Sequence, residues 1–139
     1  MRTDAAVLGS LTIPGRAEHV SEARAFVAKS LGEDHPSTEV AVLLASEVIT
    51  NAVLHSDSRR TGGTVRVVVV DSSDGILVKV ADDGSRHSAP VVKADVHSDE
   101  GRGLFLVQQL AAQWGYLQDE AGRTVWFRLG AALLASADR

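Results

Sequence analysis

The chain has 139 residues, of which 45% are hydrophobic and 23% charged, a composition that is ordinary for one soluble globular domain. The formal net charge of −4, without a clustered run of Lys and Arg, argues against direct binding to nucleic acid, which needs a basic surface. The absence of cysteine excludes disulfides and thiolate metal sites, and no apolar stretch reaches the ~20 residues of a membrane span, so a cytoplasmic protein without a membrane partner is expected.

The first half of the chain predicts one short strand followed by two helices. Residues 11–14 form an extended segment that Pro14 ends or marks as an edge. Residues 18–31 place four apolar side chains at helical spacing, and Gly32 is a suitable C-cap. Polar and proline residues then suit the first turn of a second helix, which runs to about His55.

The second half predicts two hairpins separated by a long polar segment and a third helix. Residues 65–70 and 75–81 are β-branched runs joined by a turn signal. Residues 82–102 are rich in Gly, Ser, His and Asp, and segments of this length are often lids or binding loops. A helix is expected over 104–114, followed by a hairpin over 116–129.

This order of elements predicts the fold class. Adjacent strands joined by tight turns favour a largely antiparallel sheet, and the helices must bury their apolar faces on one side of it. We therefore expect an α+β sandwich, and not a doubly wound parallel sheet. The expected organisation is a single domain over residues 1–139 with its core at about 11–129.

A polar stripe on the second helix is the most informative feature. Glu47, Asn51 and His55 are four residues apart and therefore stack on one side of a helix. At about 100° per residue the stripe falls among apolar side chains, so the helix is expected to be apolar nearly all round and buried. Burying an unpaired carboxylate and an amide costs several kcal/mol, so a metal ion, ordered water or a ligand should meet them. The alternative is an internal network in which Glu47 bonds an arginine or the backbone.

A carboxylate at the end of a predicted strand is the second candidate. Asp82 stands where the strand over 75–81 ends, two residues before Gly84. Such a carboxylate can accept a hydrogen bond from a ligand amine, and the glycine permits a close approach to the backbone. An ordinary Asx-turn would explain the same residues without a ligand.

A glycine pair before the third helix is the last candidate. Gly101, Arg102 and Gly103 directly precede Leu104, where the free amides and the dipole of the helix favour an anion. The segment is not a dinucleotide fingerprint, because a third glycine and a preceding strand are missing, and it is not a Walker motif.

In chain order, these three segments resemble the conserved boxes of the GHKL ATPases, which include gyrase-type topoisomerases, heat-shock chaperones, sensor histidine kinases and mismatch-repair proteins. The phrases over 46–56 and 101–111 are similar to the anti-sigma-factor serine kinase branch and to short stand-alone regulators of filamentous actinobacteria. The resemblance runs from about Leu11 to Leu129. It implies the Bergerat fold, a two-layer sandwich of helices on a mixed, mostly antiparallel sheet.

The resemblance also implies ATP and Mg²⁺ as ligands. Asp82 would accept the adenine amine, with Thr124 assisting through water. Asn51 would hold Mg²⁺ through its carbonyl oxygen, which is the donor type this ion prefers. Glu47 would orient water or take the proton of a serine hydroxyl on a protein substrate.

The glycine boxes would bind the phosphates. Backbone amides around Gly101 and Gly103, at the start of the helix that Leu104 opens, would cradle the β- and γ-phosphates, and Arg102 would add charge. The aspartate box departs from the pattern of the family at Gly84, because the second glycine that often follows two residues later is replaced by Arg86. The start of the lid is therefore expected to be stiffer, or to close differently.

The implied function is an ATP-dependent serine/threonine protein kinase that phosphorylates a protein antagonist of the anti-anti-sigma type and binds a sigma factor. Homodimers occur in this branch. The alternative is a nucleotide-gated protein-binding module with little or no phosphotransfer, which would keep Asp82 and the glycine box but would not need Glu47. A sensor histidine kinase domain is disfavoured, because no dimerising helix pair is recognisable beside the 11–129 core.

Overall fold

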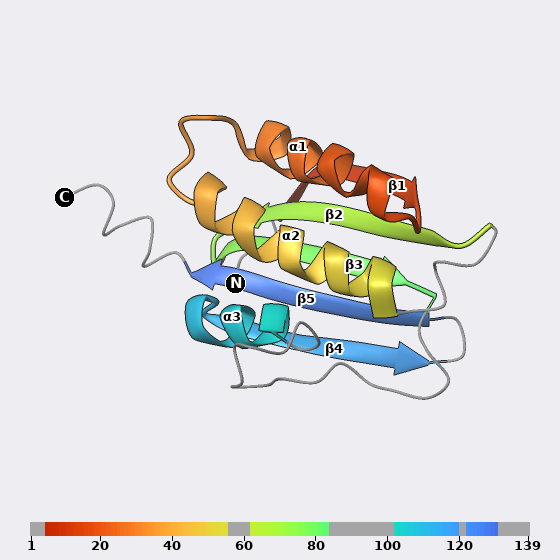
Figure 1. Ribbon diagram of the computed structural model, residues 1–139. Helices are drawn as coiled ribbons and strands as arrows, with labels where there is room; N and C mark the ends of the chain where they lie inside the picture. The colour runs from red at the N-terminus through yellow and green to blue at the C-terminus, as the bar shows by residue number, and fades with distance from the viewer. Residues whose placement is uncertain (1–4, 56–61, 84–101, 120–121, 131–139) are drawn as a thin grey trace.

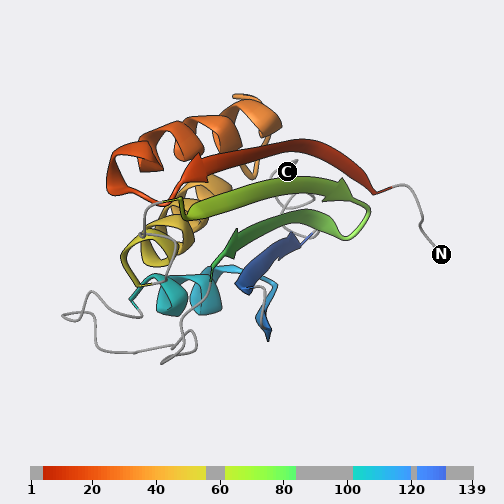
Figure 2. The same ribbon diagram turned by 90° about the vertical axis from the view of Figure 1, so that its right-hand side faces the viewer.

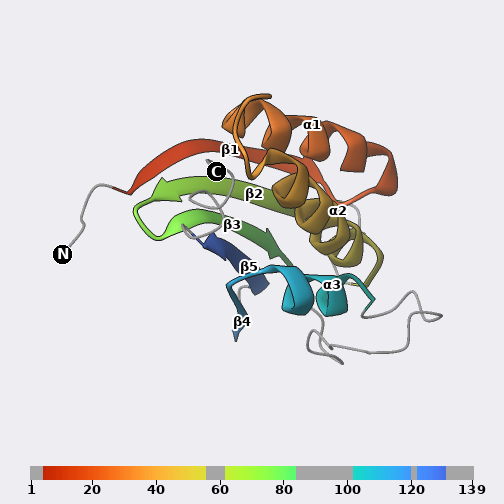
Figure 3. The ribbon, with the colours of Figure 1, turned by 90° about the vertical axis from the view of Figure 1, so that its left-hand side faces the viewer.

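The computed structural model describes residues 5–55, 62–83, 102–119 and 122–130. The elements, in chain order, are β1 (Ala6–Pro14), the 3-10 helix η1 (Ala17–His19), α1 (Val20–Leu31), α2 (Thr38–His55), β2 (Thr64–Ser72), β3 (Gly75–Asp82), α3 (Arg102–Leu110), β4 (Gln113–Asp119) and β5 (Gly122–Gly130). The strands form one antiparallel sheet in the order β1-β2-β3-β5-β4 (Figure 1). The helices cover one face of this sheet, as the two side views show (Figures 2 and 3). The predicted α+β sandwich is therefore confirmed.

The core lies between this helical layer and the sheet. Side chains alternate between the two faces of a strand, so every second residue points toward the helices. In β5 this alternation is complete, with buried residues at every odd position from 123 to 129. Directly opposed residues on β2, β3 and β5 then form apolar rows across the sheet, which stabilise it through cross-strand contacts. Two of these rows are Val67, Val80 and Val125, and Val69, Val78 and Phe127.

Several local predictions from the sequence are confirmed. Ala23 and Val27 of α1 are buried against the core, as the helical spacing of the apolar residues requires. Gly32 ends this helix with a φ of 92°, and its N–H donates to the carbonyl of Ala28 at 2.8 Å. The first predicted hairpin also forms, with Ser72 paired to Gly75.

The third helix is shorter than predicted. It ends at Leu110, and Trp114, expected on its apolar face, lies in β4 opposite Phe127. The change occurs within two residues: the N–H of Ala111 still donates to Val107, whereas the N–H of Ala112 donates to Arg128 of β5. The apolar spacing of this segment fits both conformations, and sheet pairing to β5 decides between them.

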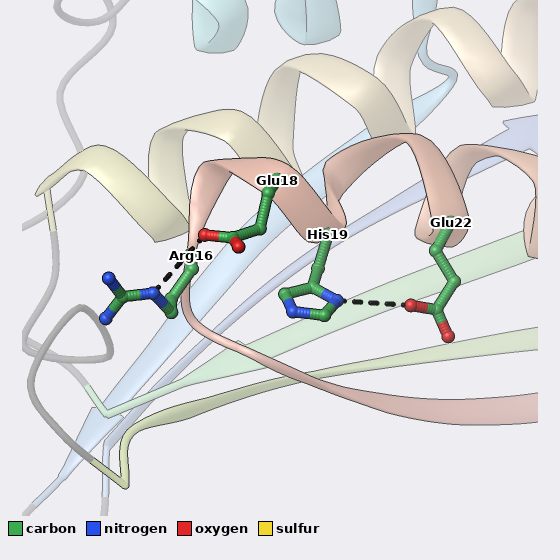
Figure 4. Close-up of polar contacts among 4 residues, drawn as sticks. All are labelled: Arg16, Glu18, His19 and Glu22. Carbon is green, nitrogen blue, oxygen red and sulfur yellow. Dashed lines mark hydrogen bonds and ion pairs between the residues drawn. The ribbon is translucent and has the colours of Figure 1, made fainter.

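The η1 segment and the first turn of α1 carry two polar contacts, an ion pair between Arg16 and Glu18 and a hydrogen bond between His19 and Glu22 (Figure 4). Arg16 Nε and Glu18 Oε1 are 3.3 Å apart, and so are His19 Nδ1 and Glu22 Oε1. Exposed pairs of this kind contribute little to stability because water and salt screen them. The apolar side of α1, and not these charges, therefore holds the helix on the sheet.

Gly122 permits the close approach of β5 to the end of β3. Its φ is 150°, and a Cβ atom at this position would lie 2.2 Å from the carbonyl oxygen of Asp82. That distance is far inside van der Waals contact with backbone, so any side chain would push the two strands apart. Gly32 has the same kind of backbone conformation but lies in open space.

We expect Gly122→Ala to lower the free energy of unfolding by about 1–3 kcal/mol more than Gly32→Ala, because it adds overpacking to backbone strain. Urea denaturation of both variants measures the difference. Equal losses in the two variants would contradict the close approach.

Candidate functional site

Glu47 and Asn51 lie on the side of α2 that faces away from the core. Both are half-buried, and Leu43 and Leu54 beside them are exposed. The opposite side of the helix is fully buried against the sheet and its neighbouring helices. The expectation that α2 would be buried all round is therefore wrong, because its sheet-facing side alone supplies the core contact.

The alternative interpretation, an internal network around Glu47, is not found within the described ranges. The side chains of Glu47 and Asn51 have no hydrogen-bonding or ionic partner in those ranges. Two oxygen-bearing side chains, one helical turn apart, are therefore available to a ligand on this side of α2. His55 is the last residue of the helix, and its side chain lies outside the description.

Asp82 forms a buried ion pair that the sequence analysis did not predict. It is the last residue of β3, directly opposite Arg123 of β5. Arg123 Nη2 donates to Asp82 Oδ2 at 3.2 Å, and the two side chains are only 3% and 1% exposed, respectively. Arg123 is two and four residues before Val125 and Phe127, and alternate residues of a strand share a face, so it lies on the helix-facing side of the sheet. This spacing of two is the sequence signal that places Arg123 on that side.

Thr124 does not lie beside Asp82 on this side. It follows Arg123 along the strand, so its side chain belongs to the other face of the sheet, in register with Ala81 and Leu117. A shift of one residue along a strand exchanges the two faces. The structure therefore places Arg123, and not Thr124, opposite the carboxylate.

The glycine box is only partly described. α3 begins at Arg102 and contacts α2, which also contacts β3, so the three predicted segments belong to neighbouring elements (Figure 1). The backbone of Arg102, Gly103 and Leu104 forms the first turn of α3. The predicted residues Gly84 and Gly101 lie outside the described residues.

A model of the histidine kinase-like ATPase domain family matches residues 13–129. The chain belongs to this family. The serine-protein kinase RsbW of Oceanobacillus iheyensis is 29% identical over 114 residues, covering 72% of each chain, and that of Listeria monocytogenes is 27% identical over 115 residues, covering 73% of each. The resemblance inferred from the three motifs is thus confirmed.

A solved structure shows the same fold for this histidine kinase-like ATPase domain. It contains the RsbU and RsbW domains of Rv1364c from Mycobacterium tuberculosis, and the match has a TM-score of 0.58 at 19% identity. The match covers 88% of the present chain, which spans about a third (32%) of the solved chain. At this identity the similarity establishes the arrangement of helices and strands.

The donors on α2 suit a divalent cation that is shared with phosphates. Among the described residues, no group of three His, Asp or Glu side chains could enclose a metal ion. Mg²⁺ is typically held by one or two protein oxygens together with phosphates and water. The half-exposed amide of Asn51, one turn from Glu47, fits that mode of binding.

A separate cavity of about 420 Å³ lies at the end of α2 next to η1. It is lined by Gly15, Arg16, Ala17, Glu18, Val53 and Leu54. None of the predicted site residues lines it, so we do not assign the nucleotide to it. No helix in the described part of the chain is long and apolar enough to cross a membrane.

The ion pair should be strongly coupled in a double-mutant cycle. We expect Asp82→Asn and Arg123→Met together to destabilise the protein by at least about 1 kcal/mol less than the sum of the single variants, because each single change leaves a buried group without its partner. Chemical denaturation measures the coupling.

Arg128 provides the matched control for this cycle. It lies on β5 but on the opposite face, where it donates a hydrogen bond to Gln113 Oε1. Its Cζ atom lies 6.0 Å from the centroid of the Trp126 ring. The effects of Asp82→Asn and Arg128→Met should add within about 0.5 kcal/mol. Equal coupling in both cycles would show that the Asp82–Arg123 contact is not specific.

Proposed function

We propose that the protein is an ATP-dependent serine/threonine protein kinase that regulates a sigma factor by phosphorylating a protein antagonist. Its relatives in O. iheyensis and L. monocytogenes are named serine-protein kinases. The observation that carries the proposal is that Glu47 and Asn51 lie one turn apart on the accessible side of α2. An oxygen that can bind a cation and a carboxylate that can accept a hydroxyl proton are two of the groups that phosphoryl transfer uses.

The nucleotide would extend from the sheet to the helices. Asp82 would accept a hydrogen bond from the adenine amine at the end of β3. The amides in the first turn of α3, at Gly103 and Leu104, would bind the phosphates, since these N–H groups have no partner within the helix. Gly84, Gly101 and Arg102 complete the proposed phosphate and lid contacts. Thr124 would reach the base only if β5 rearranged, so we give it no direct contact.

Asn51 would bind Mg²⁺ through its side-chain carbonyl oxygen. When bound, the cation neutralises charge on the phosphates and fixes their orientation. The structure supports this assignment through the half-exposed position of Asn51 beside Glu47. The amide is uncharged, so it adds an oxygen donor without repelling the phosphates.

Glu47 would act as the general base. It would accept the proton of the serine or threonine hydroxyl on the protein substrate. The hydroxyl oxygen then forms a bond to the γ-phosphorus while the bond from that phosphorus to the bridging oxygen of ADP breaks. Phosphoprotein and ADP leave, and Glu47 returns its proton to solvent.

The protein partners would be a small antagonist of the anti-anti-sigma type and a sigma factor. The exposed side of α2 offers Leu43 one turn from Glu47 and Leu54 one turn from Asn51, so a substrate hydroxyl could be presented to the carboxylate across an apolar contact. Dimerisation, which occurs in the resembling branch, would leave this side accessible if it used another surface.

Binding of the nucleotide should stabilise the protein. Saturation at about 100 times the Kd adds about 2.7 kcal/mol to the free energy of unfolding, because the ligand binds only the folded state. We expect Mg-ATP to raise the Tm of the wild type, and Asp82→Asn to weaken the shift. Asp71→Asn, which changes an exposed carboxylate of β2, is the matched control. No shift in the wild type at millimolar Mg-ATP would refute the proposal.

The kinase reaction should depend on Glu47. We expect Glu47→Gln to reduce transfer of labelled phosphate to the antagonist by about 10²–10⁴-fold, because the amide cannot accept the proton. The Tm shift with Mg-ATP should remain. Glu39→Gln, an exposed position in the first turn of the same helix, should leave transfer unchanged.

Two results would contradict this mechanism. Equal labelling by the wild type and Glu47→Gln would remove Glu47 from the reaction. Nucleotide binding without any labelled partner would instead favour a nucleotide-gated protein-binding module.

A further inference from the structure

We infer that Arg123 is a second base-recognition residue, which donates a hydrogen bond to a ring nitrogen of adenine next to the amine that Asp82 accepts. The inference rests on the proposed ATP site. It assigns to the Asp82–Arg123 pair a role in specificity that a purely structural ion pair would not have.

The first observation is the placement of the charge. Arg123 is 3% exposed and stands on the helix-facing side of β5, where the other inward residues, Val125, Phe127 and Leu129, are apolar. A guanidinium in such surroundings requires several hydrogen-bond acceptors, because it has five donors and remains charged. Within the described residues, the structure gives it one carboxylate oxygen, Asp82 Oδ2.

The second observation is an unpaired donor on the same group. Arg123 Nε is completely buried and has no hydrogen-bond partner within the described residues. Arg123 Nη2, which lies on the same edge of the guanidinium as the Nε–H, contacts Asp82 Oδ2. One face of the pair therefore combines a carboxylate acceptor with an N–H donor that lacks an acceptor.

This combination matches the amine edge of adenine. The 6-amino group is a donor, and the two ring nitrogens that flank it, N1 and N7, are acceptors. If Asp82 accepts a hydrogen bond from this amino group, one of the two ring nitrogens lies next to the Asp82–Arg123 contact. Because the guanidinium is planar and rigid, a donor on it can be aimed at one ring nitrogen while another remains on the carboxylate.

The opposite interpretation is that Arg123 occupies Asp82 and thereby blocks the base. Blocking would need only the contact from Nη2 to Asp82, whereas base recognition also gives the buried Nε an acceptor. The experiment distinguishes the two interpretations by the direction of the change in affinity.

The test compares ATP with two analogues in which one ring nitrogen is replaced by C–H. Calorimetry in the presence of Mg²⁺ measures the Kd of the wild type for ATP, 1-deaza-ATP and 7-deaza-ATP. We expect one analogue, but not the other, to bind about tenfold or more weakly, which is the loss of one charge-assisted hydrogen bond. This comparison needs no variant, so it does not depend on whether a variant folds.

Arg123→Lys then tests whether Arg123 is the donor. Lysine keeps a positive charge beside Asp82 but offers its donors from a single point, so it cannot reproduce the fork. We expect it to bind ATP about tenfold more weakly and to lose the discrimination between ATP and the sensitive analogue. Arg128→Lys, on the other face of β5, should keep both the affinity and the discrimination. Thermal unfolding without nucleotide confirms that each variant is folded.

Three outcomes overturn the inference. Equal affinity of the wild type for all three nucleotides shows that no ring nitrogen is read. Discrimination that survives in Arg123→Lys assigns the donor to another group, and tighter ATP binding by that variant shows that Arg123 blocks the site. In these cases ATP still binds and the proposed function stands, whereas a wild type that does not bind ATP removes both.

Discussion

The pairing of β3 with β5 is the constraint on which the site depends. Its register places Val80 against Val125 and Val78 against Phe127, so the same hydrogen-bonded ladder builds the core and, one row further, opposes Asp82 to Arg123. The close approach at Gly122 ends that ladder next to the carbonyl of Asp82. The polar pair is therefore the last row of an otherwise apolar face, and any slip that would separate its charges would also disrupt the core.

The second helix has two functions on two sides. Small and branched residues, including Ala41, Ala45 and Ile49, pack the buried side and let α2 lie close to the sheet. The other side carries Glu47 and Asn51 at the spacing of one turn. Because the buried side anchors the helix, the positions of the two polar side chains are fixed by core packing. Their chemistry thus costs the fold little, since neither is taken fully out of water.

The sequence predicted well those features that depend on a single periodicity. The spacing of Ala23 and Val27 identified the buried side of α1, and the turn signal before Gly75 identified the first hairpin. Prediction from the sequence failed where the same residues fit both a helical and a strand periodicity. Trp114 suits the apolar side of a helix and a strand equally, and only its pairing with Phe127 of the next strand decides between them.

The candidate site shows the same limit at the level of single side chains. The motif identified Asp82, because a carboxylate before a glycine turn is a local pattern. It pointed to Thr124 and gave no sign that Arg123 lies opposite Asp82, since the face on which a strand residue lies depends on a register that a motif does not contain. Glu47 and Asn51 lie on one side of α2, as predicted, but the exposure of that side was not predicted. Helical periodicity gives the direction of a side chain relative to the helix and not relative to its neighbours.

The two ends of the proposed nucleotide site are held in place by different kinds of contact. The end for the base is part of the sheet, where Asp82 and Arg123 are fixed by backbone pairing on both strands and by burial. The end for the phosphates is built from the accessible side of α2 and the first turn of the short helix α3, which depend on helix–helix packing. In the proposed site, recognition of the base would therefore rest on paired strands. Transfer chemistry would rest on residues that the packing of α2 and α3 holds in place.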